Sequence, residues 1–205
     1  MILRKISYYI IAICAVLIGI YPAIYFIADR KFGLLASKSE ALLADPLWNT
    51  MFYIHIILGG VALLIGWLQF SKKLRLKNLQ LHRKIGITYV ISCLLSGFSG
   101  FYIALYATGG ISPKLGFASM AIVWFFTTLF GFTSVTKGNI TKHQKLMIYS
   151  YATCFSAVTL RIWLPILGNI FGSFLPAYRF VAWLSWLPNI LVAYLIIKYQ
   201  FKTTT

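Results

Sequence analysis

Six long runs of apolar residues alternate with short polar segments along the chain. The runs cover residues 6–28, 51–70, 85–107, 115–136, 146–167 and 180–199. Each run is close to the roughly 20 residues that a helix needs to cross the hydrocarbon core of a bilayer. Because backbone groups in lipid must be paired within the chain, the pattern predicts an all-α, polytopic bundle of six transmembrane helices.

The composition agrees with this pattern. Hydrophobic residues make up 60% of the 205 residues and charged residues only 11%, which is far outside the range of soluble domains. Residues 29–50 form the longest segment between runs, so a small extramembrane element is expected only there. We therefore expect a single integral membrane domain over residues 1–205, with an uncleaved first span.

Basic residues gather on one side of the predicted membrane. Most of the 19 Lys and Arg fall in the segments on the side of the N-terminus, while all three acids lie on the opposite side, in residues 29–50. By the positive-inside rule, both termini are cytoplasmic and the protein is a multi-pass protein of the cell inner membrane. We attribute the net charge of +16 to this topology and to contact with anionic lipid headgroups, and not to nucleic acid.

Two segments of the chain resemble each other. "HRKIGITYVISC" at 82–93 and "HQKLMIYSYATC" at 143–154 share a histidine, a lysine, an isoleucine and a cysteine at a constant offset of 61 residues. This offset indicates a repeat in which the hairpin of the second and third spans recurs as the hairpin of the fourth and fifth.

One face of the second span carries small and polar residues. His55, Gly59, Ala62, Gly66 and Gln69 follow one another at spacings of four and three, which places them on one side of a helix. Small residues allow another helix to pack closely, and they also allow a flat cofactor to lie against the backbone. Packing is the commoner use of such a face, whereas an ionisable residue such as His55 at membrane depth indicates a functional site.

The fifth span contains the one cation predicted to lie inside the membrane, Arg161. It follows His143 by 18 residues, or five turns of a straight helix, so both side chains are expected to project in the same direction. No span contains a carboxylate, so Arg161 either reaches the outer headgroups or binds an anionic group such as a propionate, carboxylate or phosphate. We expect it at the depth of His55.

Gln69, His82 and His143 are expected to form a second polar layer on the cytoplasmic side. The absence of carboxylates in the spans leaves imidazole as the main ligand for chemistry there, and imidazole binds haem iron, copper and zinc. His82 and His143 share a depth and are therefore the candidate metal ligands, although a histidine at a helix start also contacts headgroups.

The segments "YIHIILGGVALLIGWLQF", "LHRKIGITYV", "YATGG", "KHQKLMIYSYATCFSAVTLR" and "WLSWLPN" resemble a bacterial family of predicted membrane proteins, domain of unknown function 2306. The family's conserved histidines and its Leu-Arg pair fall on His55, His82, His143 and Arg161. A tryptophan that often follows the histidine corresponding to His143 is missing here. The resemblance implies a membrane fold and no established activity.

Our leading hypothesis is an electron-transfer or cofactor-handling protein that binds haem b or a quinone within the bundle. In it, His82 and His143 are cytoplasmic-side ligands, His55 is an outer ligand or hydrogen-bond partner, and Arg161 holds an anionic substituent. Two alternatives remain: a permease for a small anion or lipid that uses Arg161 and His55, and an accessory subunit of a larger membrane complex. A homo-oligomer is compatible with each, and whether the protein is an enzyme is open.

Overall fold

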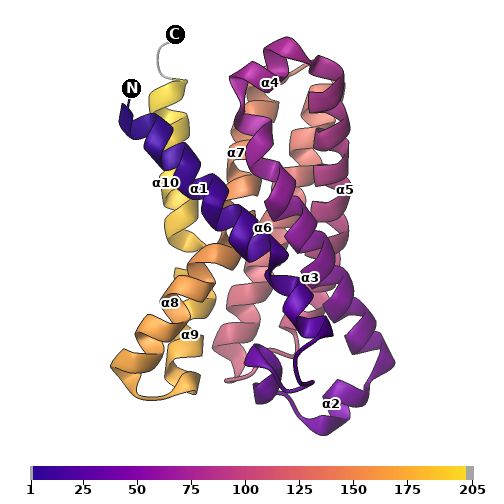
Figure 1. The fold of residues 1–205 in the computed structure, drawn as a ribbon, viewed down its shortest axis with the longest axis vertical. Helices are drawn as coiled ribbons and strands as arrows, with labels where there is room; N and C mark the ends of the chain where they lie inside the picture. Colours follow the sequence, from indigo (N-terminus) through magenta and orange to yellow (C-terminus); the bar gives the residue numbers. More distant parts are fainter. Residues whose placement is uncertain (1, 202–205) are drawn as a thin grey trace. The chain divides into compact units, whose positions relative to one another are not determined.

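The fold consists of helices. A computed structural model describes residues 2–201, with side chains from residue 6 onward, and every regular element in that range is helical. Six helical segments within it are long and apolar enough to cross a membrane, which confirms the six predicted spans (Figure 1). They are Ile6–Phe26, Pro46–Phe70, Leu79–Ala104, Ile111–Thr136, Ile140–Phe171 and Phe174–Gln200.

The chain forms two compact units, residues 1–96 and residues 97–205, and the boundary falls inside the helix α5, Leu79–Ala104. Each unit is described by itself. The single membrane domain, the repeat of hairpins and the cytoplasmic position of both termini stay predictions.

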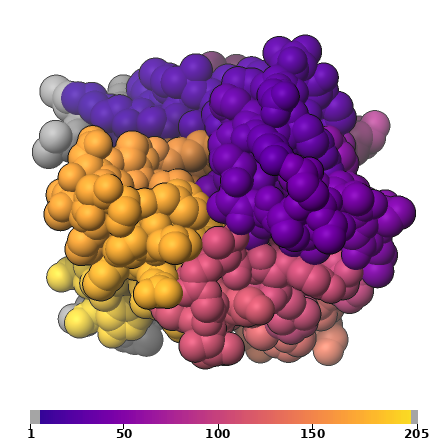
Figure 2. All heavy atoms as spheres, turned by 90° about the horizontal axis from the view of Figure 1, so that it is seen from below, coloured from indigo at the N-terminus to yellow at the C-terminus, as the bar shows by residue number. Residues whose placement is uncertain are grey.

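Unit 1 contains the first two spans and most of the third. Its helices are α1 (Ile2–Ile20), η1 (Tyr21–Phe26), η2 (Gly33–Ser37), α2 (Glu40–Ala44), α3 (Pro46–Gly66), η3 (Trp67–Phe70), α4 (Lys72–Lys77) and the first part of α5. Short helices η2 and α2 lie in the 29–50 segment, where a small extramembrane element was expected. Figure 2, the view from below, shows this segment in indigo to purple on the surface of unit 1.

Glycines bring α1 and α3 close together. A Cβ atom on Gly60 would lie 2.7 Å from the carbonyl oxygen of Gly19, and a Cβ on Gly19 would lie 2.6 Å from Cγ of Leu64. Nearer the N-terminus of α1, the Tyr8 ring meets the Trp67 ring edge to face, with ring centroids 5.8 Å apart. The crossing is therefore set by backbone contact at the glycine pair, a usual way of packing helices in lipid.

The third and fifth spans begin earlier than their apolar runs and share the reason for it. α5 starts at Leu79 and α7 (Ile140–Cys154) at Ile140, each six residues before the predicted start, because an asparagine caps each helix. Oδ1 of Asn78 accepts from the Leu81 N–H at 2.9 Å, and Oδ1 of Asn139 accepts from the Lys142 N–H at 3.0 Å. The caps are themselves 61 residues apart, in agreement with the offset of the repeat.

Unit 2 contains the last three spans. After the end of α5, its helices are α6 (Ile111–Thr136), α7, α8 (Ser156–Phe171), α9 (Phe174–Leu184) and α10 (Leu187–Gln200). Along α6, one half packs on α7 and the other on α9. At the α9 contact, a Cβ on Gly116 would lie 2.8 Å from the carbonyl oxygen of Ala182, so a glycine again sets the distance between helices.

The fifth and sixth spans are both interrupted. α7 and α8 are separated at Phe155, and α9 and α10 at Ser185 and Trp186, so that α8 and α9 turn away from the direction of α7 and α10 (Figure 1). The expectation that Arg161 projects along the same line as His143 was therefore wrong, because it required one straight helix through Phe155.

Polar side chains pair the backbone carbonyls at these interruptions. Nδ2 of Asn189 donates to the carbonyl oxygens of Ala152 and Ser185 at 3.2 and 3.1 Å, and Oγ1 of Thr159 also donates to Ser185. Irregular backbone at membrane depth is tolerated only where such partners are present.

We predict that Gly60→Ala destabilises the protein by about 1–3 kcal/mol, because the added methyl group forces α1 and α3 apart. Thermal unfolding of the purified protein in detergent measures the effect. Gly168→Ala in α8 is the control, since a Cβ there meets no described atom within 4 Å. Equal melting temperatures for Gly60→Ala and the unchanged protein would contradict the prediction.

Candidate functional site

His55 is bonded to the backbone of the neighbouring span. Its Nδ1 lies 2.9 Å from the carbonyl oxygen of Ser96, and the Ser96 hydroxyl donates to the carbonyl oxygen of His55 at 2.9 Å. Because a carbonyl oxygen only accepts, Nδ1 carries the proton in this arrangement. The neutral ring therefore has its lone pair on Nε2.

Both ends of the small-residue face on α3 contact α5. At one end His55 is bonded to Ser96, and at the other Oε1 of Gln69 lies 3.2 Å from the position of a Cβ on Gly86. Between them, Ala62 and Gly66 are buried. These contacts support helix packing as the use of this face. Within residues 2–201, Nε2 of Gln69 is buried without a hydrogen-bond partner.

The polar residues of unit 1 lie at two levels. His82 and Ser96 are 14 residues apart on the continuous helix α5, which corresponds to about 21 Å. His55, which is bonded to Ser96, therefore cannot share a metal ion with His82. Gln69 contacts Gly86, which lies one turn beyond His82 on α5. Gln69 and His82 therefore lie at the same, second level of unit 1.

His143 in unit 2 is held in the same way as His55. Its Nδ1 lies 2.9 Å from the carbonyl oxygen of Gly131 on α6, so Nδ1 again carries a proton. A Cβ on Gly131 would lie 2.8 Å from Sδ of Met147. Thr128 lies about one turn before Gly131 on α6, and Ser150 lies about two turns after His143 on α7. Their hydroxyls are hydrogen-bonded to each other at 2.7 Å.

Arg161 lies deeper in its span than its apolar run indicates. It precedes the end of α8 at Phe171 by ten residues, or about 15 Å. Its Nη1 donates to the carbonyl oxygen of Ala157 at 2.9 Å, one turn towards the start of α8. The guanidinium is thus directed towards the middle of the span, which argues against contact with headgroups at the Phe171 end.

The structure brings together only part of the predicted site. His55 and Arg161, like His82 and His143, belong to different units, so the shared depth of each pair stays a prediction. Among the described residues, no group of three or more His, Cys, Asp or Glu side chains is placed to hold a metal ion. Sequence reasoning missed Ser96 and Gly131, because they contribute backbone carbonyls that every residue possesses.

We predict that ¹⁵N NMR of the labelled protein finds a proton on Nδ1 of the imidazoles of His55 and His143. This follows from their carbonyl partners. Assignment uses His55→Gln and His143→Gln, each of which removes one set of signals. A ring whose only proton is on Nε2 would contradict the geometry.

Comparison with known proteins places the chain in a family. A family model described as a predicted membrane protein, DUF2306, matches residues 52–197, which is more than half of the chain and extends from α3 into α10. No curated protein and no solved structure matches the chain. The match includes all three histidines, Gln69 and Arg161. The chain therefore belongs to the DUF2306 family of predicted membrane proteins.

Proposed function

We propose that this membrane protein binds haem through its histidines and takes part in electron transfer. The observation that carries the proposal is the arrangement of two imidazoles: His55 and His143 each donate Nδ1–H to a helix carbonyl. Histidines that bind metals almost always donate their other ring N–H to a carbonyl, carboxylate or water. Such a bond fixes the orientation of the ring and makes Nε2 the nitrogen that binds the metal.

The donor set of the spans suits haem iron. No span carries a carboxylate, and imidazole is a usual axial ligand of haem. Haem iron takes at most two ligands from the protein, because the macrocycle supplies the rest. In this proposal His82 and His143 are the haem ligands on the cytoplasmic side. His55 is a ligand or a hydrogen-bond partner at the outer level of polar residues.

Arg161 and Gln69 have complementary roles in this proposal. The guanidinium of Arg161, at membrane depth, holds an anionic substituent such as a haem propionate. Nε2 of Gln69, which is buried and has no partner within residues 2–201, is a hydrogen-bond donor for a cofactor. A quinone is the alternative cofactor, since its carbonyl oxygens accept such bonds.

We predict that protein purified in detergent from haem-replete cells shows a Soret band that shifts when dithionite reduces the iron. His143→Ala lowers the haem content about tenfold, because an axial ligand is lost. Gln144→Ala, a change at the adjacent half-buried residue, keeps it. A protein with neither a Soret band nor extractable quinone contradicts the proposal.

A second candidate function, transport of a small anion or lipid, is favoured by the two interrupted spans. Discontinuous helices commonly form the substrate sites of transporters, near the middle of the bilayer. Here both interruptions lie in unit 2, are joined by Thr159 and Asn189, and have Arg161 directed towards their level. An arginine at this depth is a functional candidate by default.

For transport, we predict that Arg161→Ala abolishes uptake of a small radiolabelled carboxylate into liposomes that contain the protein, because the change removes the cation that selects the anion. Arg179→Ala on α9 is the matched control, since Arg179 is an exposed arginine of the same unit and also donates to a carbonyl oxygen. Uptake that is absent from the unchanged protein, or that survives Arg161→Ala, contradicts this function.

A further inference from the structure

Arg30, in the segment that follows η1, is held by neutral groups. It is half-buried, and its Nη1 donates to the hydroxyl of Tyr53 at 3.0 Å. Its Nη2 donates to the carbonyl oxygen of Leu43 at 3.1 Å and to Oδ1 of Asn49. These three bonds fix the guanidinium against the first two turns of α3. None of the acceptors carries a negative charge.

The acids of the chain are all engaged elsewhere. Asp29 accepts from the backbone N–H of Lys31 at 2.8 Å, and Asp45 caps α3. Glu40 pairs with Lys31, and their hydrogen bond raises the pKa of the lysine ammonium. An arginine has five N–H donors, so two of those of Arg30 are left without a partner among the described residues.

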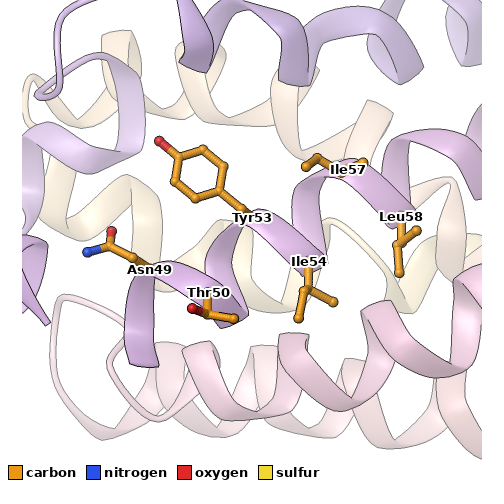
Figure 3. A pocket seen from close by; sticks show the side chains of 6 residues that line it. All are labelled: Asn49, Thr50, Tyr53, Ile54, Ile57 and Leu58. Carbon is orange, nitrogen blue, oxygen red and sulfur yellow. The ribbon is translucent and has the colours of Figure 1, made fainter. Parts of the chain in front are cut away.

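A groove along α3 begins at the residues that hold Arg30. It has a volume of about 520 Å³ and is lined by Asn49, Thr50, Tyr53, Ile54, Ile57 and Leu58. Figure 3 shows Asn49 and Tyr53 towards one end of this row and Ile57 and Leu58 at the other. The row extends over nine residue steps of α3, from Asn49 to Leu58, or about 14 Å along the helix. The groove thus has a polar end near a cation and an apolar length parallel to a membrane-spanning helix.

We infer that this groove binds an anionic phospholipid of the leaflet on the side of the 29–50 segment. The phosphate accepts from the two remaining N–H groups of Arg30, as arginine commonly binds phosphate. One acyl chain lies against Ile54, Ile57 and Leu58. A second copy of the chain suits the groove less well, because its three acids are already engaged. The inference does not depend on haem binding or transport.

Native mass spectrometry of the detergent-purified full chain tests the inference with three added lipids that have the same acyl chains. These are phosphatidylglycerol, phosphatidylcholine and diacylglycerol. We predict that phosphatidylglycerol binds most tightly and diacylglycerol, which lacks the phosphate, least. Arg30→Gln weakens phosphatidylglycerol binding about tenfold, as expected for loss of charged hydrogen bonds. Arg179→Gln, a change at an exposed arginine of unit 2, leaves it unchanged.

A second variant tests the groove without touching Arg30. Ile57→Trp fills the apolar length and weakens binding of both phospholipids, whereas Ile162→Trp, at another exposed isoleucine, on α8, does not. Comparison of these two tryptophan variants tests the proposed lipid site even if Arg30→Gln fails to fold. The inference is overturned if the three lipids bind equally, if folded Arg30→Gln binds like the unchanged protein, if Ile57→Trp has no effect, or if lipid-free dimers form and exclude phospholipid.

Discussion

The polar groups inside this protein depend on one constraint: a bilayer offers no water, and the spans offer no carboxylate, so main-chain carbonyls are the chief acceptors available. Many polar side chains in the described spans donate to such carbonyls. Those at the candidate site and at the interrupted spans include His55, His143, Thr159, Arg161 and Asn189. Each bond pairs a side chain that would otherwise be costly at that depth.

This constraint also determines the chemistry that the histidines offer. A carboxylate partner would stabilise a charged imidazole, whereas a carbonyl partner only orients the neutral ring and fixes its proton on Nδ1. The carbonyl partners of His55 and His143 therefore orient both rings with Nδ1 as the donor. A neutral, oriented imidazole is what a metal ligand requires, and this is why the proposed function depends on the acceptor more than on the presence of histidine.

The six spans could be predicted because the length of each apolar run, and the unequal distribution of charges between the runs, are read directly from the residues. The start of α3 at Pro46 precedes its apolar run, and its signal in the sequence is the pair Asp45 and Pro46, which forms the cap and the first turn. The interruption at Phe155 could not be predicted, because neither proline nor glycine stands there, while Pro165 lies inside the intact helix α8. Beside this interruption, Asn189, which is 34 positions beyond Phe155 in the sequence, donates to the carbonyl oxygen of Ala152.

The partners of the histidines were hidden for a related reason. A carbonyl becomes an acceptor for a side chain on another helix only where the two backbones approach closely, and that distance depends on small residues. At Gly131 the same residue does both: its missing side chain lets α7 approach, and its carbonyl accepts from His143. A methyl group there would press on Met147, one turn beyond His143 on α7, and would move the imidazole away from its acceptor. In this family member the position of an imidazole is therefore a consequence of helix packing, and the glycine is as much a part of the candidate site as the histidine.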